Sequence, residues 1–103
     1  MELIEKLLGM VEDELEDAEK YAKCAVKNKD IDGVLAKNFY DLSMEEMQHM
    51  NILHEAVVRQ ISLHKKEHGE PPVAMQAVYD FLHERHISKA MDVKACQEMY
   101  RGG

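Results

Sequence analysis

The chain has 103 residues, of which 46% are hydrophobic and 32% charged, and its formal net charge is −7. This length allows one domain with one modest core, so we expect residues 1–103 to form a single helical domain. The acidic balance and the lack of a basic cluster argue against nucleic acid as a partner. No apolar run approaches the roughly 20 residues that a membrane span requires, and no secretory signal is visible, so we expect a cytoplasmic protein with no membrane partner.

The composition favours helix almost everywhere, because Glu, Lys, Ala, Leu and Met are abundant while Gly and Pro are confined to few places. Two clusters of turn-forming residues, near 29–33 and 67–71, interrupt the helical periodicity. We therefore predict three long helices, from about Glu2 to Asn28, from about Val34 into the Ser62–Lys66 region, and from about Pro72 to Tyr100. Short connections between long helices favour an all-α, antiparallel up-down-up bundle.

The first predicted helix has an apolar face that Glu14 interrupts near its edge, where a leucine would be expected. Glu14 is therefore a candidate site residue, although a lone acid beside a core face is also typical of a rim position. Other acids of this helix alternate with lysines and predict a solvated surface, so we leave them out of any site. These acids are Glu12, Asp13, Glu16 and Glu19.

The second predicted helix carries Glu46 and His49 within an apolar series at alternating steps of three and four. We expect both side chains to lie side by side on the seam that faces the other helices. A buried ionised carboxylate needs a partner, and Glu-x-x-His facing inward is the ligand motif of carboxylate-bridged metal sites in helical bundles. The alternative is an inert polar layer. The remaining members of the expected seam are Leu35, Phe39, Leu42, Leu53 and Ala56, while His54 falls outside it and is interpreted as solvent-facing.

The third predicted helix offers further candidate ligands on its inner side. His86 falls near the middle of the apolar face, His83 on its edge, and Asp80 precedes His83 by three positions. The inner apolar face comprises Met75, Val78, Tyr79, Leu82, Ala90, Val93, Cys96 and Tyr100. A second apolar stripe on the far side predicts a homodimer or larger assembly, because three helices leave it uncovered. This stripe comprises Ala77, Phe81, Met91, Ala95 and Met99.

The level of each candidate along the bundle follows from its distance to the turns. Glu14 and Glu46 are equally far from the first turn, so we expect them to face each other. His86 comes closest to the level of His49, whereas Asp80 and His83 lie about one turn lower. Which group of the third helix completes the site, and from which chain, stays open.

The two cysteines, Cys24 and Cys96, are too few for a disulfide framework and match no zinc motif. Both fall within helical patterns, so we interpret them as buried structural thiols. An up-down-up bundle would place them near the same end, and spacing alone does not establish whether they approach each other.

The pattern Glu14…Tyr21…Phe39…Glu46-x-x-His49 is similar to the repeat unit of rubrerythrins and the wider ferritin-like superfamily. The resemblance covers about residues 12–53 and implies Glu14, Glu46 and His49 as ligands of a non-haem metal, iron or manganese. The chain departs from that pattern in having one further long helix instead of two and no second Glu-x-x-His. Short encapsulated ferritins are similar in layout, and in them a single such unit completes an iron site across a dimer.

Two functions are compatible with these features. The first is a ferritin-like metal-binding protein, for which the resemblance implies oxidation of ferrous ion or reduction of peroxide if it is catalytic. One chain supplies fewer than the six ligands usual for a di-iron site, and a symmetric dimer would double them. The second is a non-catalytic helical assembly module, in which Glu14, Glu46 and His49 form a buried polar layer that fixes register.

Overall fold

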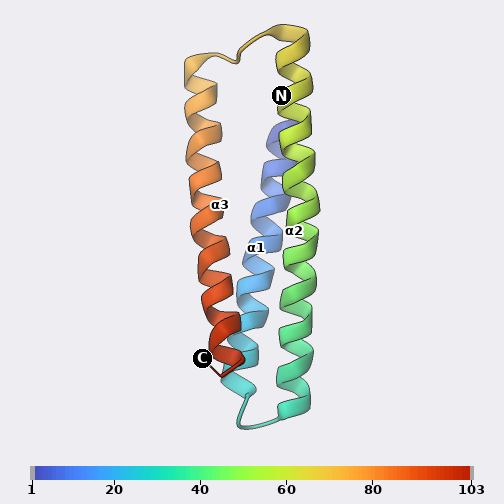
Figure 1. The fold of residues 1–103 in the computed structure, drawn as a ribbon, viewed down its shortest axis with the longest axis vertical. Coiled ribbons are helices and arrows are strands. Elements are labelled where there is room, and N and C mark those ends of the chain that lie inside the picture. Colours follow the sequence, from blue (N-terminus) through green and yellow to red (C-terminus); the bar gives the residue numbers. More distant parts are fainter. Residues whose placement is uncertain (1, 103) are drawn as a thin grey trace.

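Three helices account for nearly all of residues 2–102, which the computed structural model describes. They are α1 (Glu2–Asn28), α2 (Gly33–His68) and α3 (Val73–Tyr100), and the described residues contain no strand. The prediction of an all-helical chain with three long helices is confirmed. Successive helices reverse direction, and α2 alone is long enough to span the molecule (Figure 1). Its 36 residues at about 1.5 Å each match the 54 Å longest extent.

Both helix breaks have a clear local cause. Asp32 caps the start of α2, because its Oδ1 accepts a hydrogen bond from the Leu35 backbone N–H at 3.0 Å. Gly69 ends α2 with a φ of 77°, and its N–H donates to the Lys65 carbonyl at 2.8 Å. The helix therefore continues past the expected Ser62–Lys66 region to His68, since no residue that disfavours helix occurs before the glycine.

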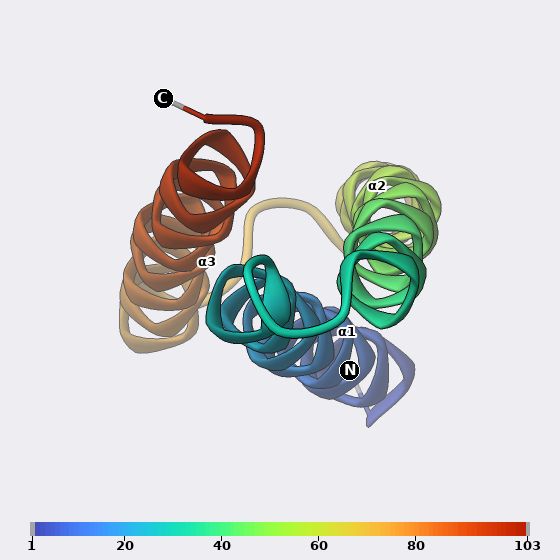
Figure 2. The ribbon, with the colours of Figure 1, turned by 90° about the horizontal axis from the view of Figure 1, so that it is seen from below.

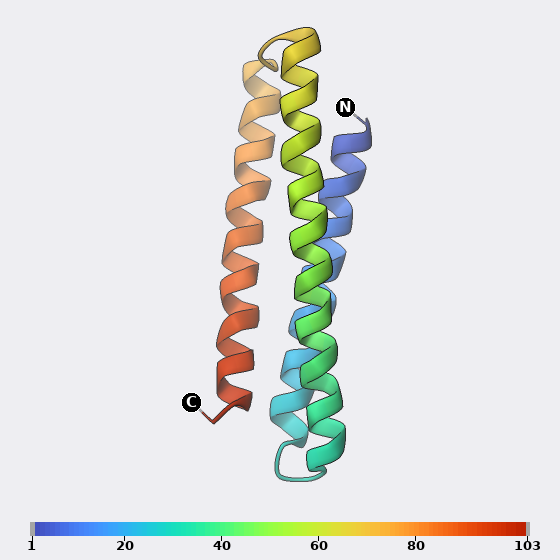
Figure 3. The same cartoon turned by 45° about the vertical axis from the view of Figure 1, so that its right-hand side comes forward.

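α1 is the central helix of the bundle, because it packs along both α2 and α3, which contact each other through few residues. Seen end-on, α2 and α3 diverge on either side of α1 (Figure 2). α1 also begins short of the end where α2 and α3 are joined (Figure 3). The fully buried residues of α1 are Val11, Leu15, Ala18, Ala22 and Ala25. No helix among the described residues combines the length and hydropathy needed to cross a membrane.

A buried polar contact joins all three helices near the first turn. The Ser43 hydroxyl donates to the Ala18 carbonyl at 2.7 Å, and Gln97 Nε2 donates to Ser43 Oγ at 2.9 Å. Ser43 and Gln97 are both buried. Because each buried polar group has a partner, this contact fixes the relative position of the helices without leaving a desolvated donor or acceptor.

The predicted inner face of α2 is wrong by about one residue. The buried series is centred on small residues and methionines, whereas Leu35 and Leu42 are exposed. α1 presents alanines where it meets this part of α2, so the two backbones approach closely and only small side chains fit between them. The bulkier leucines therefore lie to one side of the contact. The buried residues of α2 are Ala36, Ser43, Met47, Met50 and Val57.

The predicted inner face of α3 is largely confirmed, since Tyr79, His86 and Val93 are buried, although Val78 is 53% exposed. Residues of the outer stripe are exposed as expected: Ala77, Phe81, Met91, Ala95 and Met99. Cys24 and Cys96 are half-buried free thiols, not the fully buried ones we expected, because each lies on the flank of its helix face.

Candidate metal centre

Glu14 of α1 and Glu46 and His49 of α2 lie together between the two helices. One ligand atom from each residue lies within 4.8 Å of the others, and no other group of three such residues does so among residues 2–102. His49 Nδ1 is 3.4 Å from Glu14 Oε2 and 3.9 Å from Glu46 Oε2. The prediction that Glu14 and Glu46 share a level and meet across the helices agrees with this geometry. It follows from the short first turn, which sets both residues at equal distances along antiparallel neighbours.

The three side chains differ in their burial. Glu14 and Glu46 are 25% and 18% exposed, whereas His49 is 55% exposed, so the expectation that His49 lies on a buried seam is wrong. The one-residue displacement of the α2 inner face turns His49 outward and leaves Glu46 on the flank. The group therefore lies at the edge of the α1–α2 contact and opens to the surface through His49.

Too little positive charge surrounds the two carboxylates to keep the pKa of Glu46 at its ordinary value. Glu14 Oε2 is buried and has no hydrogen-bond partner among the described residues. The pKa of Glu46 is raised to about 7, first because the neighbouring Glu14 carboxylate can share a proton with it, and then by burial and by the negative charge of Glu14. His49 lowers this pKa only in part, and Asp17 raises it further. The group is thus an acidic site with an unmet demand for a cation.

This donor set suits a divalent cation. Two carboxylates and one imidazole are ligands that manganese and ferrous iron accept. Ligand atoms on one ion lie about 3–4 Å apart when the bonds are about 2.1 Å, so modest side-chain rotations would bring the three residues onto one ion. A cation would also partner the buried oxygen of Glu14 and remove the repulsion between the carboxylates. The residues present therefore fit a metal ion.

None of the α3 candidates joins this group within the chain. His86 instead contacts Glu12, with Nε2 donating to Glu12 Oε2 at 2.9 Å. Glu12 and Glu14 are two positions apart, so they point roughly 200° away from each other around α1. A residue that reaches Glu12 is therefore on the wrong side of α1 to reach Glu14. Within one chain, His86 therefore does not complete the site.

Asp80 and His83 also have other partners. Asp80 Oδ1 accepts a hydrogen bond from Gln76 Nε2 at 2.9 Å. The His83 ring stacks on His54 of α2, with ring centres 5.5 Å apart. Both residues face the groove between α2 and α3, so neither contributes to the Glu14 group of its own chain. Ligands from a neighbouring chain stay a prediction.

Glu12 is largely buried and paired, so the interpretation that it lies on a solvated surface is wrong. Besides His86, it contacts Arg85 at 2.9 Å and Lys89 at 3.7 Å, and its side chain is only 20% exposed. Burial alone would raise the pKa of Glu12, but hydrogen bonds from Arg85 and His86 and the charges of Arg85 and Lys89 outweigh it, so the pKa is lowered. The helical spacing indicated that Glu12 lies beside the core, because Glu12 follows Leu8 by four and precedes Leu15 by three, and both leucines are buried.

Comparisons with protein-family models, with curated proteins and with solved structures found no match for this chain. The ferritin-like resemblance therefore stays a prediction that depends on the Glu14…Tyr21…Phe39…Glu46-x-x-His49 pattern.

Proposed function

We propose that the protein binds a divalent metal ion, iron or manganese, through Glu14, Glu46 and His49. The observation that carries this proposal is the pair of adjacent carboxylates whose only basic neighbour in the group is a half-exposed histidine. A pKa of about 7 at Glu46 means that the metal-free group holds a proton near neutral pH. A cation can replace that proton and satisfy both carboxylates at once.

A second copy of the chain would supply the missing ligands. Three ligand residues leave further coordination positions of an ion open, and a two-fold axis beside His49 would bring a second set of three. The exposed apolar residues on the same side of α2 support this arrangement, because Leu42, one turn before Glu46, is 38% exposed and Leu35, further along, is 39% exposed in a single chain. The outer stripe of α3, with Phe81 64% exposed and Met91 65% exposed, is a second surface on which chains could associate.

The ferritin-like class is the most specific form of this proposal. A bound iron in such a setting would supply oxidation of ferrous ion or reduction of peroxide. The chain's own part would be to hold the ion, with Glu14 and Glu46 as charged ligands and His49 as the neutral one. Tyr21 stacks with Phe39, with ring centres 6.3 Å apart, two turns along α1 from Glu14.

Metal content by elemental analysis tests the proposal. The parent, Glu46→Ala and His49→Ala proteins would each be refolded with excess manganese or ferrous iron and freed of unbound metal. We expect bound metal in the parent and its loss in both variants, since each removes one of three donors. Glu12→Gln is the matched control. Glu12 lies on α1, like Glu14, and it also contacts a histidine, but it already has basic partners. Equal and negligible metal in all four proteins would leave the polar-layer function standing.

A further inference from the structure

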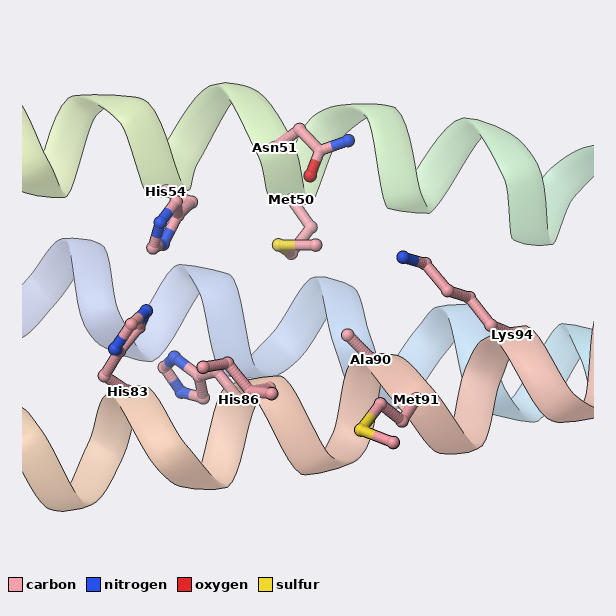
Figure 4. A pocket seen from close by; sticks show the side chains of 9 residues that line it. Met50, Asn51, His54, His83, His86, Ala90, Met91 and Lys94 are labelled. Atoms are coloured by element: carbon pink, nitrogen blue, oxygen red, sulfur yellow. The ribbon is translucent and has the colours of Figure 1, made fainter.

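A groove between α2 and α3 contains three histidines that the metal centre does not use. His54 reaches into it from α2, and His83 and His86 reach into it from α3. Figure 4 shows the His54 and His83 rings facing each other across the groove, with α1 behind them. The groove exists because α2 and α3 diverge and contact each other through few residues.

The separation of the two rings suits a shared metal ion. The ring centres of His54 and His83 lie 5.5 Å apart and their planes differ by 13°. A tetrahedral zinc ion that binds two imidazole nitrogens at about 2.1 Å holds the two ring centres roughly 5.2 Å apart. The ring centres therefore already lie at about the separation of a two-imidazole site, and rotation of each ring about its χ2 angle would turn a nitrogen toward the ion.

Asp80 is the candidate third ligand, and its carboxylate would have to turn toward the two rings, because its oxygens and the ring nitrogens do not all lie within 4.8 Å of one another. It lines the same groove and precedes His83 by three positions, so both side chains lie on one face of α3. Its Oδ1 now accepts from Gln76 Nε2, and an amide that holds a ligand carboxylate in this way helps to orient it toward a metal. His86 lies in the same groove, but Glu12 already holds its Nε2.

We propose that His54, His83 and Asp80 form a second metal site, which binds a zinc-class transition metal and links α2 to α3. Two imidazoles and one carboxylate favour zinc, nickel or copper, whereas the carboxylate-rich group at Glu14 favours manganese or ferrous iron. The two sites are thus distinct in place and in preferred metal, and this site does not depend on the proposed function of the first. Because the ion would bridge two helices that otherwise scarcely touch, it would close the open side of the bundle.

Zinc titration followed by imidazole ¹⁵N NMR of the parent protein tests this site, because each histidine reports separately. We expect the His54 and His83 signals to shift together, at the same zinc concentration. His54→Ala should abolish the response of His83, and His83→Ala should abolish that of His54. Asp80→Asn should weaken zinc binding by about tenfold or more while both rings still respond together.

The matched control is His64→Ala. His64 and His68 form another close histidine pair, with ring centres 4.6 Å apart on α2 alone, so zinc bound there should leave the His54 and His83 response unchanged. Circular dichroism would verify that each variant keeps its helices. The proposal is overturned if His83 still responds in His54→Ala, or if neither ring responds to stoichiometric zinc. It is also overturned if the affinity falls on dilution of the protein, because the ion would then join two chains.

Discussion

Two clusters on opposite sides of α1 combine the same residue types and reach opposite electrostatic states. On the α3 side, Glu12 meets His86, Arg85 and Lys89, and the pKa of this carboxyl is lowered. On the α2 side, Glu46 meets a second carboxylate and one histidine, and its pKa rises to about 7. The difference is the supply of positive charge.

This difference separates a structural contact from a candidate binding site. The cluster at Glu12 has partners for each charge and stabilises the contact of α1 with α3. The group at Glu14, Glu46 and His49 keeps a buried carboxylate oxygen without a hydrogen-bond partner, so it is a site that an added cation would complete. A histidine beside a glutamate is therefore not enough to indicate a metal site. The balance of charge around the carboxylate distinguishes a candidate metal site from a structural contact.

Removing Glu12 should produce the largest loss of stability. Glu12→Ala leaves His86, which is only 6% exposed, without its hydrogen-bond partner, and it also leaves two cations facing each other. We expect the free energy of unfolding to fall by about 1–3 kcal/mol. Urea denaturation of metal-free protein measures it. An unchanged midpoint would mean that solvent satisfies the cluster equally well.

Glu46→Gln should raise the free energy of unfolding of metal-free protein, whereas Glu12→Ala should lower it. The pKa of Glu46 in the folded state, about 7, lies above its ordinary value of 4.5, so between these values the folded protein keeps a proton that the unfolded chain has released. Stability therefore falls as pH rises through this window. At about pH 8 we expect Glu46→Gln to be more stable than the parent by about 1–2 kcal/mol, a figure reduced for the partial exposure of the site.

The pH profile of this variant provides the control. Well below pH 4.5 the parent is protonated at Glu46 in both the folded and the unfolded state, so the gain from Glu46→Gln should nearly vanish there. Denaturant titrations at several pH values measure this change. A gain that is the same at all pH values would reflect packing, and the repulsion between Glu14 and Glu46 would not be its cause.

Arg85→Ala should have the smallest effect. Arg85 donates to Glu12 Oε1 at 2.9 Å, but its side chain is 49% exposed, so solvent and salt screen the pair. We expect a loss of at most about 0.5 kcal/mol, which should disappear in high salt. A loss as large as that of Glu12→Ala would show that Arg85, and not His86, is the main partner of Glu12.

The sequence predicts the helices better than it predicts their contacts. The turns near Asp32 and Gly69 are local, since each depends on a cap that one or two residues form. Local sequence does not determine which residues form the inner face of α2, because that depends on how closely α1 approaches. The buried series continues at helical steps through Ser43, Met47, Met50 and Val57, but stronger hydrophobic residues lie one position away from several of them.

The candidate site could be predicted from the sequence only in part, for the same reason. Glu14, Glu46 and His49 come together through one short turn, which residue counting captures. The α3 candidates depend on rotation around α1, and counting levels says nothing about rotation. His86 was therefore assigned to the wrong side of α1, and the contact of His54 with His83 was missed.

The most direct test of the metal centre is the free energy of unfolding of the parent and of Glu46→Gln, each with and without manganese near pH 8. Without metal we predict that Glu46→Gln is the more stable protein. With free manganese at about one hundred times the dissociation constant, the parent should gain about 2.7 kcal/mol and become the more stable one. Glu12→Gln should gain as much from manganese as the parent does, because Glu12 lies on the other side of α1. An equal gain in the parent and in Glu46→Gln, or no gain in either, would contradict metal binding at Glu14, Glu46 and His49.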